Sequence, residues 1–96
     1  MRYKVVLHKS VIKLQSKIPP SVLKNLVAWI DSVETLGLPK TQCVKGYHDE
    51  PLKGALAGKR SVRLNLQWRL IYQLNKDDTI IYVMVERITP HDYRTS

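Results

Sequence analysis

Cysteine is almost absent from this sequence of 96 residues, and long apolar runs are absent altogether. Cys43 is the only cysteine, so an intramolecular disulfide cannot form and a secreted scaffold held together by disulfides is excluded. No segment approaches the roughly 18 consecutive apolar residues of a membrane span. No basic head leads into an apolar run at the N-terminus. We therefore expect a cytoplasmic protein without a membrane partner.

The sequence also lacks the motifs of several enzyme classes. One cysteine and three scattered histidines do not give the spacing of metal ligands. A phosphate-binding glycine loop, a nucleophile elbow and a Cys–His signature are all missing, so nucleotide hydrolysis and acyl transfer have no support. We expect neither a metal nor another cofactor.

Acidic residues are scarce relative to basic ones. Sixteen Lys and Arg against eight Asp and Glu give a formal charge of +8 and a sequence pI near 9.8. The hydrophobic content of 44% and charged content of 25% are ordinary for a globular protein. The length suits a single domain covering residues 1–96. This composition predicts a folded domain whose partner is anionic, with nucleic acid as the main candidate.

The first half of the sequence predicts a strand and two helices. Residues 2–8 alternate loosely between apolar and polar side chains, as in a strand. Ser10 could cap a short helix, which Pro19-Pro20 would interrupt. From Ser21 to Leu36, apolar residues recur every three or four positions, so we expect the longest helix here, with Gly37 ending it.

The second half predicts a loop followed by a meander of strands. Residues 37–59 hold all four glycines, and we expect a long, partly irregular connection there. Period-two patterns predict strands over 61–66 and 68–74, a turn at 75–78 and a central strand over 79–85, followed by a polar tail from 87 to 96. Together these elements predict an α+β domain with helices on one face of a mostly antiparallel sheet.

Three segments combine titratable and cationic side chains: 48–54, 58–69 and 91–94. RNA cleavage without a metal needs a base, an acid and fixed cations around the phosphate. Arg63 and Arg69 alternate with the apolar positions of adjacent strands, so both could face one phosphate. The alternative is that they only make the surface soluble. His91 could reach the same face if the tail folds back, although a surface histidine is more often inert, as His8 and His48 could also be.

Four segments of the second half, read together, resemble the motif blocks of RelE-superfamily toxins, in particular YoeB-like and HigB-like proteins. They are Glu50-Pro51-Leu52-Lys53-Gly54, Gly58-Lys59-Arg60-Ser61-Val62-Arg63-Leu64-Asn65, Trp68-Arg69-Leu70-Ile71-Tyr72 and His91-Asp92-Tyr93. The resemblance implies a microbial-ribonuclease-like fold with two N-terminal helices packed on a four-stranded sheet. It also implies cleavage of mRNA on the ribosome and a cognate antitoxin protein as partner.

The resemblance implies roles for individual residues. Glu50 matches the carboxylate that YoeB-like enzymes use as general base, and Arg69 matches the arginine that stabilises the phosphate. Whether His91 or Tyr93 is the general acid stays open, because Asp92 separates two residues that are adjacent in YoeB-like proteins. Further cations are expected to bind RNA phosphates: Lys53, Lys59, Arg60, Arg63 and Arg94.

Two other functions remain open at this point. A basic module that binds RNA or the ribosome without catalysis would have the same charge, although it would not need Glu50 or His91. A ParE-like relative of the same fold would inhibit gyrase instead of cleaving RNA.

Overall fold

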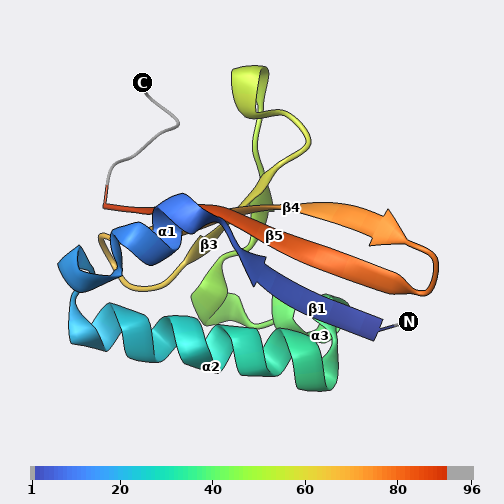
Figure 1. Cartoon of the computed structure of the whole chain (residues 1–96), viewed down its shortest axis with the longest axis horizontal. Coiled ribbons are helices and arrows are strands. Elements are labelled where there is room, and N and C mark those ends of the chain that lie inside the picture. Colours follow the sequence, from blue (N-terminus) through green and yellow to red (C-terminus); the bar gives the residue numbers. More distant parts are fainter. Residues whose placement is uncertain (1, 91–96) are drawn as a thin grey trace.

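The computed structural model describes residues 2–90, in which a five-stranded sheet packs against helices (Figure 1). The elements in chain order are β1 Arg2–Leu7, α1 Lys9–Lys13, η1 Gln15–Lys17, α2 Pro20–Leu36, α3 Leu38–Gln42, η2 Lys45–Tyr47, β2 Glu50–Pro51, η3 Gly54–Leu56, β3 Arg60–Arg63, β4 Arg69–Asp77 and β5 Ile80–Thr89, where η marks a 3-10 helix. The expected α+β class is confirmed. Within the described residues, no helix combines the length and the apolar character needed to cross a membrane.

The strands lie in the order β1-β5-β4-β3-β2, with β1 parallel to β5 and the other neighbours antiparallel. The expectation of four strands is wrong, because β2 adds a fifth strand at one edge of the sheet. This strand has only two residues, which is too short to produce a pattern of alternating side chains. The sheet is therefore mixed, and its parallel edge is formed by the N-terminal strand.

The strand boundaries also differ from the expected ones. β3 ends at Arg63, and β4 continues to Asp77 before a tight turn at Asp78 and Thr79. Asp78 has a φ of 56°, as residues of two-residue hairpin turns commonly do. The polar residues 75–77 are paired with β5 because a sheet forms through backbone hydrogen bonds, which polar side chains do not prevent. β5 likewise extends to Thr89, beyond the expected end at Val85.

The two N-terminal helices begin and end for local reasons. His8, and not Ser10, caps α1, and its ring Nδ1 accepts a hydrogen bond from the Ser10 amide at 3.1 Å. α2 begins at Pro20, which needs no hydrogen-bond partner for its nitrogen in the first turn. It ends at Leu36 because Gly37 adopts a φ of 95°, which is favourable only without a side chain.

The main core lies between α2 and the sheet. α2 buries one residue per turn, and Trp29 and Val33 are fully buried. From the sheet, the same core receives Val62, Leu70, Tyr72, Val83 and Val85. The Trp29 and Tyr72 rings lie 5.6 Å apart and fill its centre. The expected apolar faces of the long helix and of the strands supply this core, but some of their expected members are exposed: Val27, Leu36, Leu66 and Leu74.

The segment between α2 and β3 is more ordered than expected. It contains α3, β2 and two 3-10 turns, and α3 is fixed by buried Leu38 and Thr41. The Thr41 hydroxyl donates to the Gly37 carbonyl at 2.9 Å. Figure 1 shows the part of this segment around η3 standing out from the sheet on the side away from α2.

Candidate functional site

Two rows of side chains cross the face of the sheet that is turned away from α2, which we call the distal face. Residues paired across neighbouring strands place their side chains on the same face. The first row runs from β2 to β5 and consists of Glu50, Ser61, Ile71 and Arg87; the second row consists of Arg63, Arg69 and Thr89. Because Val62 and Leu70, which alternate with these residues, are in the core, the two rows lie opposite the helix layer.

Arg63 and Arg69 are direct cross-strand neighbours in the second row. Leu64 donates its amide hydrogen to the Trp68 carbonyl, so Arg63 and Arg69 form the adjacent non-hydrogen-bonded pair, with Cα atoms about 4.5 Å apart. Among the described residues, the buried Nε of Arg63 has no hydrogen-bond partner. Like charges at directly opposite positions destabilise a sheet, so this pair costs folding free energy unless an anion lies between the two guanidinium groups.

The loop between β3 and β4 fixes Arg69. Its Nη1 donates to the Asn65 carbonyl at 3.1 Å and the Leu66 carbonyl at 3.4 Å. The Asn65 side chain shapes this loop by accepting the amides of Gln67 and Trp68 at 2.8 and 2.7 Å. The loop is also tied to α2 through Asn25. The guanidinium of Arg69 is thus held in place by backbone carbonyls and does not depend on a ligand for its position.

Glu50 lies on the same face as the arginine pair, on the edge strand β2. It is paired with Ser61, so Arg63 is its diagonal neighbour, at a Cα distance of roughly 7–8 Å. The structure also brings His48 close, with its Nε2 at 3.6 Å from a carboxylate oxygen of Glu50. Lys53 follows on the exposed segment that leads into η3. The distal face therefore combines a carboxylate with two arginines.

Lys59 and Arg60 are each engaged by an acidic partner within the protein. Lys59 Nζ lies 2.6 Å from Glu86 Oε2. Arg60 pairs with Tyr72 in register, and therefore lies on the face turned toward the helices, where its Nε donates to Asp49 Oδ1 at 2.6 Å. Arg60 therefore lies on the opposite face of the sheet from Arg63 and Arg69, whereas Lys59 is held by its ion pair with Glu86.

A buried polar network surrounds Asp49. Besides the bond from Arg60, its carboxylate accepts a hydrogen bond from the Tyr72 hydroxyl at 2.6 Å, and Gln42 donates to that hydroxyl at 3.0 Å. Burial raises the pKa of Tyr72, and the hydrogen bond to Asp49 raises it further. For Arg60, burial opposes the charged form, but the hydrogen bond and the charge of Asp49 raise its pKa overall. The network is therefore an ion pair with a neutral tyrosine.

Arg87 is a residue of the distal face that the sequence patterns missed. It was expected in a polar tail, but β5 continues past it and pairs it with Ile71. The register of β4 and β5 shifts between Ile71 and Tyr72, because Tyr72 pairs with Val85 and Ile71 with Arg87. Glu86 is therefore an extra, bulged residue of β5. The alternation of β5 alone could not reveal the bulge, because the strand is apolar on both sides up to Val85.

The expected residues His91, Tyr93 and Arg94 lie outside the described residues. Their placement in the site stays a prediction. The last strand residue, Thr89, is paired with Arg69 and belongs to the second row of the distal face. His91 follows Thr89 by two positions in the sequence.

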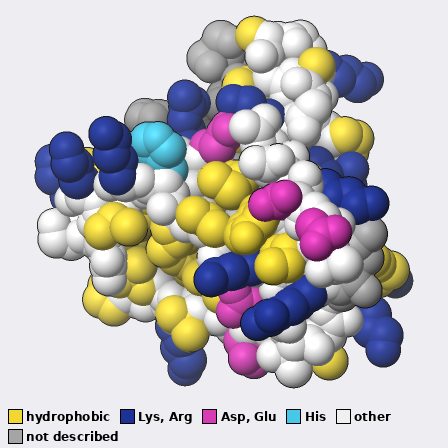
Figure 2. All heavy atoms as spheres, turned by 45° about the vertical axis from the view of Figure 1, so that its right-hand side comes forward, with side chains coloured by type: hydrophobic (Ala, Val, Ile, Leu, Met, Phe, Trp, Pro, Cys, Tyr) yellow, Lys and Arg dark blue, Asp and Glu magenta, His cyan; other side chains and the backbone are white. Residues whose placement is uncertain are grey.

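The positive charge of the molecule is not confined to one patch. On the face shown in Figure 2, Lys and Arg side chains are spread over several places, with acidic side chains between some of them. Among residues 2–90, no group of three or more His, Cys, Asp or Glu side chains could hold a metal ion.

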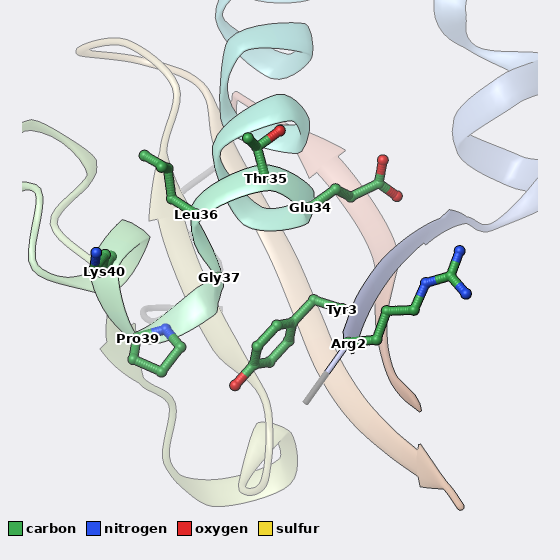
Figure 3. Close-up of a pocket in the computed structure, with 8 residues that line it drawn as sticks. All are labelled: Arg2, Tyr3, Glu34, Thr35, Leu36, Gly37, Pro39 and Lys40. Atoms are coloured by element: carbon green, nitrogen blue, oxygen red, sulfur yellow. The ribbon is translucent and has the colours of Figure 1, made fainter. Parts of the chain in front are cut away.

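A separate hollow of about 480 Å³ lies at the edge of the sheet formed by β1 (Figure 3). It is lined by Arg2, Tyr3, Glu34, Thr35, Leu36, Gly37, Pro39 and Lys40. One wall is fixed because Glu34 Oε2 accepts a hydrogen bond from the outward-facing amide of Val5 at 2.9 Å. β1 and β2 are opposite edges of the sheet, so this hollow is remote from Glu50.

Comparison with known proteins finds similarity in structure only. No family model and no curated protein sequence matches this chain. A YoeB/ParE toxin from Agrobacterium tumefaciens matches with a TM-score of 0.66 and 18% identity, over 95% of this chain and 99% of the toxin. A point mutant of YafQ from E. coli matches with a TM-score of 0.65 and 23% identity, over 93% of this chain and 92% of YafQ.

A third similar structure contains a partner. It is the E. coli DinJ–YafQ toxin–antitoxin complex, which matches with a TM-score of 0.56 and 26% identity over 93% of this chain and 92% of that chain. These matches cover nearly the full length on both sides. The chain has the fold of the YoeB- and YafQ-like toxins, and at the level of the fold this confirms the resemblance found in its sequence.

Proposed function

We propose that this chain is the toxin of a toxin–antitoxin pair, an endoribonuclease of the RelE superfamily that cleaves mRNA on the ribosome in the cytoplasm. The observation that carries the proposal is the distal face, where Glu50 lies diagonally across from Arg63, and Arg63 is paired with Arg69 on the next strand. A carboxylate near two arginines is unfavourable for simple RNA binding, but it is suited to removing a proton beside a phosphate.

The proposed reaction is an attack within the RNA strand. Glu50 removes the proton of a 2′-hydroxyl, and the 2′-oxygen attacks the adjacent phosphorus. The bond to the 5′-oxygen breaks, and His91 or Tyr93 delivers a proton to that oxygen, leaving a 2′,3′-cyclic phosphate. Arg63 and Arg69 neutralise the negative charge that builds up on the phosphate oxygens in the transition state.

The pairing of two arginines supports an anionic ligand. Arg63 and Arg69 occupy directly opposite positions, where like charges are unfavourable, and a phosphate bound by both would replace this cost with two charge-assisted interactions. Arg69 is held by backbone carbonyls before any ligand arrives. A group fixed in this way stabilises a transition state without reorganising during the reaction.

The remaining cations divide into two groups. Lys53 and Arg87 are exposed near the two ends of the first row, and we assign them, with Arg94, to the phosphates that flank the cleaved bond. Lys59 and Arg60, engaged by Glu86 and Asp49, hold the protein structure.

The proposed partner is a cognate antitoxin. Support comes from the DinJ–YafQ toxin–antitoxin complex, because one chain of that complex has the same fold as this chain. It also comes from charge, since residues 4–30 include five lysines and no acidic residue. A partner that binds these exposed lysines would be acidic or amphipathic.

The test of the function is the substitution Glu50→Gln, with Glu86→Gln as the matched control on the same sheet. Cleavage is measured in a single turnover with saturating enzyme on ribosomes carrying a defined message, which removes binding from the rate. We expect Glu50→Gln to slow cleavage by roughly a hundredfold or more, with ribosome binding retained. Glu86→Gln should cleave at close to the wild-type rate.

Three results would contradict the proposal. Cleavage at the wild-type rate by Glu50→Gln would remove this residue as the base. A wild-type protein that binds ribosomes tightly but leaves the message intact would be a binding module. Inhibition of gyrase supercoiling by a protein that does not cleave RNA would identify a ParE-like toxin.

A further inference from the structure

Asp49, next to the proposed base, is a buried charged residue that the proposed reaction does not use. Only 1% of its side chain is exposed. Each carboxylate oxygen has its own donor at 2.6 Å, from Arg60 on β3 and from Tyr72 on β4. The carboxylate therefore connects the edge strand β2 to the two strands that carry Arg63 and Arg69.

The backbone alone holds β2 weakly. The strand has only two residues, so few backbone hydrogen bonds join it to β3. The pairing with β3 continues for one more bond, from the Leu52 amide to the Lys59 carbonyl at 2.9 Å. On the other side the strand follows His48, whose φ of 47° is uncommon for a residue with a side chain. An edge strand this short needs a further attachment to keep its register.

Asp49 and Glu50 are adjacent in an extended segment, so their side chains point to opposite faces of the sheet. Asp49 meets Arg60 and Tyr72 on the face toward the helices, while Glu50 is paired with Ser61 on the distal face. When the carboxylate of Asp49 is fixed, the backbone of Glu50 is fixed with it. Asp49 thus acts from the face toward the helices on the position of Glu50, which lies on the distal face.

We propose that Asp49 is a positioning residue, which through Arg60 and Tyr72 holds β2 in the register that sets Glu50 diagonally opposite Arg63. The inference rests on the proposed function for its effect on cleavage. Its effect on β2 is independent of that function. A displacement of about 1 Å in a reacting group can slow a reaction by roughly a hundredfold, so a loosened β2 would lower the rate without removing any group that touches RNA.

The test is Asp49→Asn, which keeps the shape and removes the charge. Arg60→Gln is a second variant that weakens the same anchor from β3. Val33→Ala is the control, because Val33 is fully buried on α2 and is not among the residues that bind the Asp49 carboxylate; it lowers global stability without removing a group of that network. Three quantities are measured for each folded variant: hydrogen exchange of the Leu52 amide, the single-turnover cleavage rate and the Kd for ribosomes.

We expect Asp49→Asn to increase exchange at Leu52 by about tenfold or more and to slow cleavage by roughly ten- to a hundredfold. The Kd should stay within about threefold of the wild-type value, since the substituted residue is buried under the sheet. Arg60→Gln should also increase exchange at Leu52 and slow cleavage, but by smaller factors, because the hydrogen bond from the Tyr72 hydroxyl to Asp49 remains. Val33→Ala should leave the cleavage rate of the folded protein unchanged.

Wild-type exchange at Leu52 in both anchor variants would overturn the inference, as would a rate loss in Val33→Ala equal to that in Asp49→Asn. A loss that appears only in the Kd would also overturn it, because positioning acts on the rate. If the wild-type protein cleaves no RNA but Asp49→Asn still increases exchange at Leu52, the proposed function fails while the anchoring of β2 is supported.

Discussion

The two faces of the β3–β4 pair are built from alternate residues of the same strands, yet they serve opposite needs. Toward α2, Val62, Leu70 and Tyr72 are fully buried and pack around Trp29. On the distal face, Arg63 and Arg69 place two positive charges side by side. The first face lowers the free energy of the folded state by burying apolar surface, whereas the pairing of Arg63 with Arg69 on the second raises it. Such a local cost is expected where a protein binds a ligand.

The same division is visible at the edge strand within two consecutive residues. Asp49 is enclosed with two donors below the sheet, whereas the side chain of Glu50 is about one third exposed above it. A small cluster of Leu52, Leu56 and Ile71 lies on the distal side as well, so this face is only partly polar. Substitutions on the two faces should therefore separate stability from activity.

The largest expected effect is on the face toward the helices. Trp29→Ala should lower the free energy of unfolding by about 3–5 kcal/mol, because it leaves a large cavity beside Tyr72. Urea denaturation followed by circular dichroism measures the loss. Trp29→Phe is the matched control and should cost roughly half as much or less. It retains a ring, and the indole N–H that it removes has no partner among residues 2–90. Equal losses in the two variants would show that cavity size does not govern this site.

The next effect is on the distal face and concerns activity. Arg69→Ala should slow single-turnover cleavage by about a hundredfold, close to 2.7 kcal/mol of transition-state stabilisation. The free energy of unfolding should change by only about 1 kcal/mol or less, since the repulsion from Arg63 is relieved as the contacts to the loop are lost. Arg2→Ala removes the same charge from an exposed site on β1. If both variants cleaved equally fast, net charge and not the position of Arg69 would be what matters.

The smallest effect concerns Tyr72, where the two faces are linked through Asp49. Tyr72→Phe removes one hydrogen bond to a charged group and should lower the free energy of unfolding by about 1.5–3 kcal/mol at neutral pH, toward the lower end because Arg60 still pairs with Asp49.

The pH dependence of stability sharpens this prediction. The folded-state pKa of Tyr72 is raised above the ordinary value of 10.0, first by burial and then by Asp49. The stabilisation from its neutral hydroxyl is therefore fully present below pH 10 and is lost as the pH rises through the folded-state pKa. Denaturation midpoints measured between neutral pH and pH 11 should fall less steeply at the alkaline end in Tyr72→Phe than in the wild type. Parallel curves would contradict the raised pKa.

Local sequence patterns predicted the elements that depend on side chains near each other in the chain. The spacing of apolar residues in α2 follows from one helical face being buried, and Gly37 ends the helix through its own backbone conformation. The alternation in β3 and β4 correctly separates core residues from Arg63 and Arg69. The residue roles in the proposed reaction came from the resemblance of short blocks, and they remain to be tested.

Pairings between distant segments could not be predicted in this way. The sequence does not show that β1 joins β5 in parallel, that two residues after His48 form a strand, or that a bulge at Glu86 aligns Arg87 with Ile71. It also marks Asp49 and Arg60 only as charged residues in a basic, polar stretch. By itself, the sequence determined which faces are apolar, because burial is governed by side-chain hydrophobicity along each element. Only the tertiary structure decided which charged groups meet, because backbone pairing brings them together regardless of their distance in the chain.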